Sequence, residues 1–309
     1  MKRSTTKQVK ALMTMRAEVD DHVGSRTDVV GYMVGLKFKN GELTDQLGIT
    51  YFVREKIPKS DLAPRKRVPA IVKVGNSVVT TDVMVWPRMV EQSFVLPDAT
   101  IIYDQRMQGT LSCFAQNTVG FYGVSCAHCL AGADGNPATP TQVAAFSTVV
   151  HDWIAVGTST YMAYSPGLGI ENNFGYLDCG IFDLSQNSLV ERAAKGNKLR
   201  VVNDLGSLVG QILVGMSALN TPAPTKWRRA KVVAVESNAL DERCDVILAM
   251  EPPGTFKGDS GMLWLTEDGR AAAIHARGEM MPALQGSSLT TAMSAKRVSL
   301  SLGVQLIMG

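Results

Sequence analysis

The chain has 309 residues, of which 45% are hydrophobic and 19% are charged, and its formal net charge is +3. This composition is ordinary for a globular protein and supports a sizeable buried core. The small net charge argues against a protein that binds nucleic acid or a membrane surface. Two local basic groups, Arg65–Arg67 and the pair Arg228 and Arg229, are therefore expected on solvated faces.

The N-terminal residues predict a short amphipathic helix and not a signal peptide. Leu12, Met13 and Met15 are soon followed by charged residues, so no apolar core of a leader forms. No run approaches the roughly 18 apolar residues that cross a bilayer. The five cysteines, an odd number, also argue against a disulfide framework. We therefore expect a cytoplasmic protein without membrane contact.

Residues 1–95 predict a small α+β N-terminal domain with a helix and two hairpins. The Asn-Gly pair at positions 40 and 41 is a strong hairpin signal between two β-type runs. The expected elements are strands over Val29–Phe38 and Leu47–Arg54, a short helical turn over Pro58–Leu62, and strands over Ile71–Val74 and Val78–Val85. The stretch from Pro87 to Pro97 is expected to be a linker.

Residues 96–309 predict a mainly β domain. Many short β-type runs with Gly- and Pro-rich turns favour a sandwich or barrels. The expected strands are Gly109–Gln116, Val119–Ser125, Ser147–Ser159, Gly180–Asp183, Leu208–Met216, Ala230–Glu236, Asp245–Met250, Met262–Thr266 and Arg270–Ala276. One late helix is expected over Thr291–Leu302, with Met293, Val298, Leu300 and Leu302 partly on one face.

Three residues far apart in the chain form the pattern of a nucleophilic catalytic site. His128 follows a β-type run, Asp178 stands directly before another, and Ser260 lies in a Gly-Asp-Ser-Gly turn. Their order, with gaps of 50 and 82 residues, is that of the chymotrypsin-type triad. A serine hydroxyl becomes a good nucleophile only when a nearby imidazole accepts its proton, and a carboxylate orients that imidazole.

These motifs resemble those of trypsin-like serine proteases. Ser125–Cys129 (SCAHC) is similar to their histidine motif, Asp178–Leu184 (DCGIFDL) to their aspartate motif, and Gly258–Gly261 (GDSG) to their nucleophile loop. The resemblance implies a chymotrypsin-like double antiparallel β-barrel, with the site between two six-stranded barrels and with Thr291–Leu302 as the C-terminal helix. It implies a serine endopeptidase whose partner is a protein or peptide substrate.

The resemblance also assigns roles within the site. His128 is the general base, Asp178 holds it, and the N–H groups of Gly258 and Ser260 form the oxyanion hole. Asp183 is the nearest rival to Asp178, and Asp259 is expected to stabilise the loop. His22 and His151 show no partner pattern and receive no role.

Four further residues are expected to contact the substrate. Gly254 takes the place of the pocket-base residue of trypsin-like enzymes, so no carboxylate is present there for Lys or Arg. Thr255 and His275 resemble the pocket of staphylococcal-type glutamyl endopeptidases and picornavirus main proteases, which implies a preference for Glu or Gln before the scissile bond. Arg277 is also expected to attract an acidic substrate. The open alternative is that His275 is only a strand histidine bonded to backbone.

Val29–Lys39, Leu47–Pro58 and Val83–Val85 resemble the leader domain of bacterial, intracellular trypsin-like peptidases related to the plant narrow-leaf protease family. Such a domain suits recruitment or regulation, or a homo-oligomer formed through it. Two other functions stay open: a catalytically idle protease fold that serves as an interaction module, and an esterase with the same triad.

The cysteines near the histidine are expected to be thiols. Cys113 precedes Cys129 by 16 residues, the interval of the half-cystines that flank the histidine in vertebrate enzymes, but a reducing cytosol favours the reduced state. Cys126 and Cys179 are expected to pack as small hydrophobic residues. A metal site in Cys126–Cys129 would need further ligands at suitable spacing, so neither a metal nor a cofactor is expected.

Overall fold

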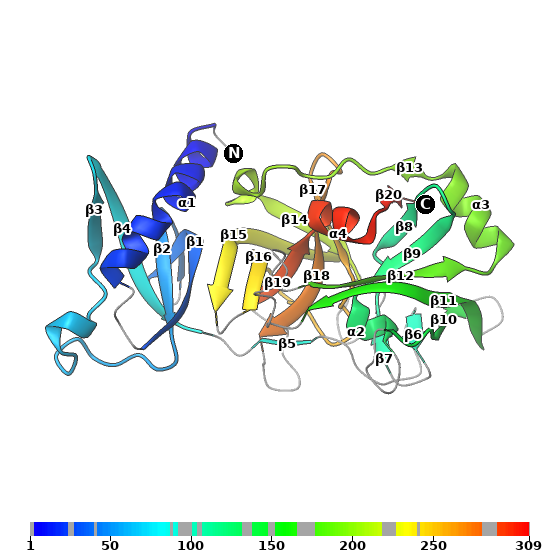
Figure 1. The fold of residues 1–309 in the computed structure, drawn as a ribbon, viewed down its shortest axis with the longest axis horizontal. Coiled ribbons are helices and arrows are strands. Elements are labelled where there is room, and N and C mark those ends of the chain that lie inside the picture. The colour runs from blue at the N-terminus through cyan, green and yellow to red at the C-terminus, as the bar shows by residue number, and fades with distance from the viewer. Residues whose placement is uncertain are drawn as a thin grey trace.

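The computed structural model describes residues 3–23, 28–39, 42–86, 89–91, 101–103, 107–131, 138–147, 152–165, 177–217, 227–239, 242–279 and 289–308. Strands dominate these residues, with the N-terminal elements at one end of the molecule and two antiparallel sheets beyond them (Figure 1). The described helices are α1 (Arg3–Val23), α2 (Ala127–Leu130), α3 (Asn187–Lys195) and α4 (Ala295–Leu302), with 3-10 turns η1 (Pro64–Lys66) and η2 (Leu205–Leu208).

A closed antiparallel barrel lies in the middle of the molecule. Its six strands, in spatial order, are β14 (Ile212–Met216), β17 (Leu263–Thr266), β18 (Ala271–Glu279), β19 (Leu289–Ser294), β16 (Glu242–Met250) and β15 (Trp227–Ala239). Pairing of β14 with β15 closes the barrel. Closure leaves no free edge along most of these strands. The loop between β16 and β17 is therefore attached at both ends to strands of the closed barrel.

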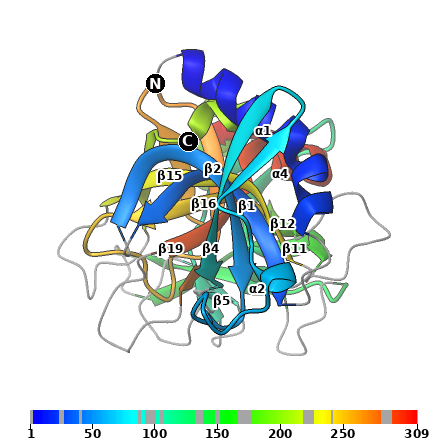
Figure 2. The ribbon, with the colours of Figure 1, turned by 90° about the vertical axis from the view of Figure 1, so that its left-hand side faces the viewer.

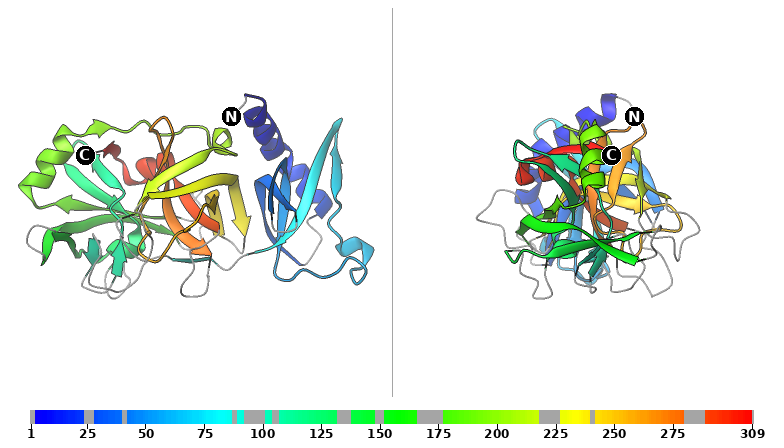
Figure 3. Two further views of the ribbon diagram at one scale, coloured as in Figure 1. Left: turned by 180° about the vertical axis from the view of Figure 1, so that it is seen from behind. Right: turned by 90° about the vertical axis from the view of Figure 1, so that its right-hand side faces the viewer.

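A second, nine-stranded sheet lies beside the barrel, as Figure 3 shows from behind. Its strands, in spatial order, are β13 (Asn197–Lys198), β20 (Gln305–Met308), β8 (Cys113–Gln116), β9 (Phe121–Ser125), β12 (Leu177–Leu184), β11 (Asp152–Ser165), β10 (Gln142–Ser147), β6 (Ile101–Tyr103) and β7 (Met107–Gly109). β9 and β12 are neighbours, with Ser125 opposite Gly180. This register brings the end of β9 close to the start of β12, where two of the predicted site residues lie.

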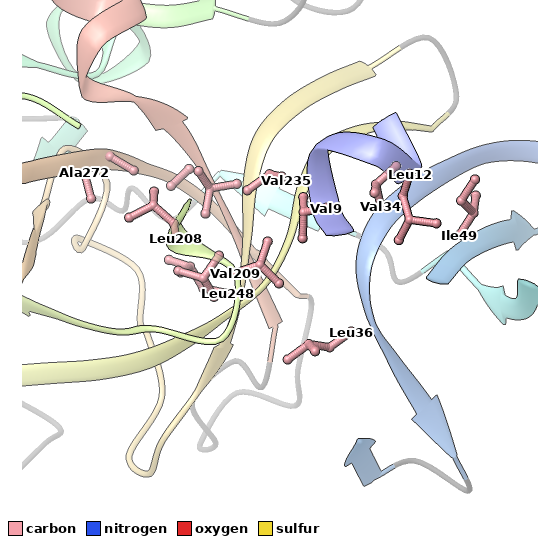
Figure 4. Packing of buried hydrophobic residues seen from close by; sticks show 14 of the residues in the cluster. Val9, Leu12, Val34, Leu36, Ile49, Leu208, Val209, Val235, Leu248 and Ala272 are labelled. Carbon is pink, nitrogen blue, oxygen red and sulfur yellow. The ribbon is translucent and has the colours of Figure 1, made fainter. Parts of the chain in front are cut away.

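The N-terminal elements join the barrel through a shared sheet. Beyond β15 the barrel sheet continues into β1 (Val29–Lys39), β2 (Glu42–Val53), β4 (Ser77–Val85) and β3 (Ile71–Val74). β1 pairs with β15, and in Figure 2 the N-terminal strands and α1 lie in front of the barrel. Val9 of α1, Val34 of β1 and Leu208 of η2 belong to one buried cluster that crosses this junction (Figure 4). The boundary predicted at residue 95 stays a prediction.

The first third of the predicted late helix is strand. Leu289–Ser294 forms β19 between β16 and β18, and only Ala295–Leu302 is helical. The Ser294 side chain caps the helix by accepting a hydrogen bond from the Arg297 N–H at 3.4 Å. Val298 and Leu302 are buried as predicted, whereas Leu300 is 69% exposed. The β-branched pair Thr290 and Thr291 favours the strand.

Other expected elements need smaller corrections. Within the predicted linker, Met89–Glu91 forms β5, which pairs with β18, and the rest of the linker lies outside the described residues. Pro58–Leu62 makes a hydrogen-bonded turn, Asp61 N–H to the Pro58 carbonyl at 3.0 Å, and not a helix. The hairpin turn at residues 40 and 41 and His151 lie outside the described residues. None of the described helices has the length and apolarity to cross a membrane.

Candidate active site

His128 and Asp178 form a buried pair where the second sheet meets the barrel. His128 lies on α2, directly after β9, and its side chain is 5% exposed. Its Nδ1 contacts the Asp178 carboxylate on β12, and its backbone N–H donates to the other carboxylate oxygen at 2.9 Å. The Asp178 side chain is fully buried. The two contacts fix both the position of the imidazole and the nitrogen that faces the carboxylate.

The loop between β16 and β17 carries Ser260. Gly258 and Gly261 have φ values of +100° and +91°, which residues with a side chain adopt only with strain. The segment before β8 anchors the loop: the Thr110 N–H donates to the Ser260 carbonyl at 2.7 Å, and the Thr110 hydroxyl donates to the Gly258 carbonyl at 2.9 Å. Among the described residues, the N–H groups of Gly258 and Ser260 have no acceptor. Two N–H donors of the loop are thus available to a ligand.

The Ser260 hydroxyl does not contact His128 in this structure. It donates to the Ala276 carbonyl of β18 at 3.2 Å. Nε2 of His128 is buried and has no hydrogen-bond partner among the described residues. The Ser260 loop and α2 are nevertheless close together. Gly109 lies against both the thiol of Cys129, which is on α2, and the carbonyl oxygen of Ser260. The structure joins His128 to Asp178 and leaves the predicted hydrogen bond between Ser260 and His128 unmade.

Asp259, the residue before Ser260, is held by a buried ion pair. Arg228 of β15 donates from Nε to the Asp259 carboxylate at 3.2 Å, and both side chains are fully buried. The Ser217 hydroxyl also donates to this carboxylate, as does the Phe256 N–H at 2.9 Å. Burial raises the pKa of Asp259, although Arg228 acts in the opposite direction. The predicted loop-stabilising role of Asp259 therefore has a structural basis, which is this set of contacts.

Arg228 corrects the sequence interpretation, which placed both Arg228 and Arg229 on a solvated face. Neighbouring residues of a strand point to opposite sides. Arg229 points outward and is 54% exposed in its pair with Glu251, whereas Arg228 enters the barrel. No local pattern marks which arginine of the pair is buried, so only the pairing of β15 in the barrel shows it.

The charges around His128 favour its protonated form. Burial lowers the pKa of His128, but the charge and hydrogen bond of Asp178, together with Cys129, raise it well above its ordinary value of 6.5. Burial raises the pKa of the Cys129 thiol, whereas contacts with Cys126 and His128 lower it, and the result is a pKa of about 6. The Asp178 carboxylate and the Cys129 thiol thus both stabilise the imidazolium of His128.

The predicted substrate residues lie on both sides of the loop. His275 of β18 is fully buried, and its Nδ1 is 3.0 Å from the Thr290 hydroxyl of β19, a partner that the sequence interpretation missed. Burial, with the positive charges of His128 and Arg228, lowers the pKa of His275 to about 3, so its ring is neutral. Thr255 is buried, and Gly254 turns back to donate to the Glu251 carbonyl at 2.9 Å.

Arg277, the fourth predicted substrate residue, lies two positions beyond His275 on β18, opposite Thr291 of β19 and Glu91 of β5 in register. It is only partly exposed. Arg277 therefore lies on the central strand of three paired strands. Its predicted role toward a substrate stays a prediction.

Comparison with solved structures finds partial likenesses to serine proteases. Thermobifida fusca Protease A is 14% identical, with a TM-score of 0.42 over 70% of this chain and 99% of its own. A glutamic acid specific serine protease, described as using a novel histidine triad in substrate binding, is 16% identical, with a TM-score of 0.43 over 69% and 100%. No protein-family model and no curated protein sequence matches the chain.

The closed antiparallel barrel, the second sheet beside it and the short C-terminal helix match the chymotrypsin-like fold that was predicted. In place of the second predicted six-stranded barrel, the described residues form a nine-stranded sheet. At these identities a likeness to solved structures concerns the fold alone, so the activity has to be inferred from the chain's own residues. The narrower resemblance to relatives of the narrow-leaf protease family stays a prediction.

Proposed function

We propose that the protein is a serine endopeptidase that cleaves a partner protein through an acyl-enzyme intermediate. The observation that carries this proposal is the buried His128–Asp178 pair beside a Gly-Asp-Ser-Gly loop with two available N–H donors. A cytoplasmic location is part of the proposal, since all five cysteines are buried thiols.

The proposed reaction uses each group once per half-reaction. The Ser260 hydroxyl turns from the Ala276 carbonyl to His128 Nε2, gives its proton to the imidazole and attacks the substrate carbonyl. The N–H groups of Gly258 and Ser260 hold the oxyanion that forms. Asp178 stabilises the imidazolium, which then protonates the leaving amine. Water repeats the sequence in place of serine and releases the acyl group. In ligand-free active sites the hydrogen bond between the nucleophile and its base is often long or poorly aligned, and it tightens only when substrate binds.

A fluorophosphonate probe tests the nucleophile. We expect the wild-type chain to gain the mass of one covalent adduct and Ser260→Ala to gain none, since only an activated serine attacks such a probe. Ser112→Ala is a matched control, because the Ser112 hydroxyl donates to the neighbouring Gly261 carbonyl and has no proposed chemistry. Labelling of Ser260→Ala at the wild-type rate would contradict the assignment.

One observation favours the alternative of an idle protease fold that serves as an interaction module. The Ser260 hydroxyl is engaged by the Ala276 carbonyl and not by His128. If that arrangement persists with substrate, the wild-type chain will not react with the probe and will not hydrolyse peptides. The same experiment therefore decides between the two functions.

The pH dependence of kcat/KM should reflect the charged surroundings of His128. The base must be neutral to accept a proton, and its pKa is raised above 6.5. Activity is therefore expected to be absent at acid pH and to increase as the pH rises through a midpoint above 6.5. A rate profile measured on a peptide ester from acid to mildly alkaline pH gives this midpoint. A midpoint at or below 6.5 would show that Asp178 and Cys129 do not act on His128 as proposed.

A preference for Glu or Gln before the scissile bond is the finer part of the proposal. If the Thr290 hydroxyl donates to Nδ1 of the neutral His275, the ring proton is on Nε2, a donor for a carboxylate or amide oxygen. Thr290→Val removes this orientation and is expected to lower kcat/KM for Glu and Gln substrates at least tenfold more than for Ala substrates. Equal losses for all substrates, or a wild-type preference for Lys, Arg or Phe, would exclude the assignment.

A further inference from the structure

Cys126 adds a third metal-binding group to the candidate catalytic pair. One ligand atom from each of Cys126, His128 and Asp178 lies within 4.8 Å of the other two, and all three residues are buried. The Cys126 thiol donates to the His275 carbonyl at 3.1 Å, which holds it on the barrel side of α2. A thiol, an imidazole and a carboxylate, close together and shielded from water, are the ligand types that zinc prefers.

A fourth donor, the Cys129 thiol, stands next to two of these three. The Cys129 thiol has no exposed surface and interacts with both Cys126 and His128, although its sulfur lies outside the group of atoms within 4.8 Å of one another. The sequence alone offered Cys126, His128 and Cys129 with no further ligand at a suitable spacing. The fold supplies it, because β12 brings Asp178 to His128 from 50 residues away. Once the Cys129 thiol moves toward Asp178, the four donors match the tetrahedral coordination of zinc.

We propose that Cys126, His128, Asp178 and Cys129 bind one Zn²⁺ ion and that this ion blocks the candidate active site. The inhibitory consequence rests on the proposed function, whereas the metal site itself does not. Zinc would replace the proton on Nδ1 of the His128 imidazolium, which would leave to the solvent while Nε2 keeps its own proton, and each coordinating thiol would also release its proton to the solvent. An imidazole that is bound to zinc no longer serves as a base for Ser260.

The geometry requires only local rearrangement. With zinc–ligand distances of about 2.0–2.3 Å, a tetrahedral ion holds its ligand atoms roughly 3.5 Å apart. The contact between His128 and Asp178 must widen, and the Cys126 thiol must give up its bond to the His275 carbonyl. His128, with 7% of its surface exposed, is the member of the set through which an ion would enter.

The first experiment measures binding by the wild-type chain without reference to activity. The full-length protein, freed of metal with a chelator, is titrated with Zn²⁺, and the metal that stays bound after gel filtration is counted. One ion per chain is expected. Co²⁺ used as a probe should give thiolate-to-cobalt charge-transfer absorption and the visible spectrum of a tetrahedral site. No bound zinc, or a cobalt spectrum without a thiolate band, would overturn the proposal.

Matched cysteine variants locate the site. Cys126→Ala is expected to weaken zinc binding at least about tenfold, the loss seen even for residues that only support a metal ligand. Cys244→Ala, which removes a buried cysteine on β16 outside the set, should bind zinc as the wild type does. Equal zinc affinity in all three proteins would overturn the proposal. The cobalt spectrum of the wild type tests the site even if Cys126→Ala fails to fold.

Inhibition is measured separately on peptide hydrolysis. Zinc should abolish activity in proportion to site occupancy, a chelator should restore it, and Cys126→Ala should need at least about tenfold more zinc for half-inhibition. Full activity of the zinc-loaded protein would overturn the blocking role. A protein that binds one zinc ion but never reacts with a fluorophosphonate would sustain the metal site and refute the endopeptidase, so the two failures are distinguishable.

Discussion

Replacing Asp178 with asparagine is expected to lower kcat for peptide hydrolysis about 10⁴-fold. The carboxylate accepts hydrogen bonds from both the ring and the backbone N–H of His128, and an amide cannot stabilise the imidazolium that forms during attack. An asparagine NH₂ facing Nδ1 also favours the tautomer with its proton on Nε2, which cannot accept a proton from Ser260. Steady-state kinetics with a chromogenic peptide, at the pH of maximum activity, measure the loss.

Asp183→Asn is the matched control for this prediction. Asp183 lies on the same strand, β12, but its side chain points to solvent, so the substitution should leave kcat within about twofold of wild type. Similar activities for the two variants would remove Asp178 from the triad. A large loss in Asp183→Asn alone would transfer the role to the rival acid that the sequence interpretation considered.

Replacing Arg228 with methionine is expected to lower the free energy of unfolding by about 3–5 kcal/mol. Methionine fills much of the volume of the arginine but leaves the Asp259 carboxylate buried without its counter-charge. The Ser217 hydroxyl and the Phe256 N–H remain as donors, so the loop keeps part of its support. Urea unfolding at neutral pH, followed by tryptophan fluorescence, measures the change.

Arg229→Met provides the control, since Arg229 pairs with Glu251 at the surface and such exposed pairs contribute about 1 kcal/mol or less. The pH adds a second test. Without Arg228 the pKa of the buried Asp259 rises further. Once Asp259 is protonated it is neutral, and it then needs no counter-charge in the folded state. The deficit of Arg228→Met should therefore shrink as the pH falls and grow as it rises. Equal stability of the two arginine variants would show that the buried ion pair is not what holds the loop.

The local sequence pattern was enough to predict most strands and the order of the three candidate catalytic residues along the chain. The runs around β9, β12, β16 and β18 are apolar and bounded by turn residues, which is a short-range property. The helix predicted over residues 291–302 was wrong over its first four residues. The β-branched pair Thr290 and Thr291 is only a weak local signal for a strand, and the neighbouring strands β16 and β18 decide the conformation. Pairing energy between distant strands overrides weak local propensity.

The candidate site divides in the same way. The Gly-Asp-Ser-Gly motif and the histidine and aspartate motifs are contiguous in the chain, so His128, Asp178 and Ser260 could be singled out from sequence alone. The partners of the neighbouring groups could not, because Arg228 for Asp259 and Thr290 for His275 are distant residues with no motif. Which of two adjacent arginines enters the barrel, and whether a thiol joins a histidine and a carboxylate, depend on strand register and close packing, which exist only once the sheets have formed.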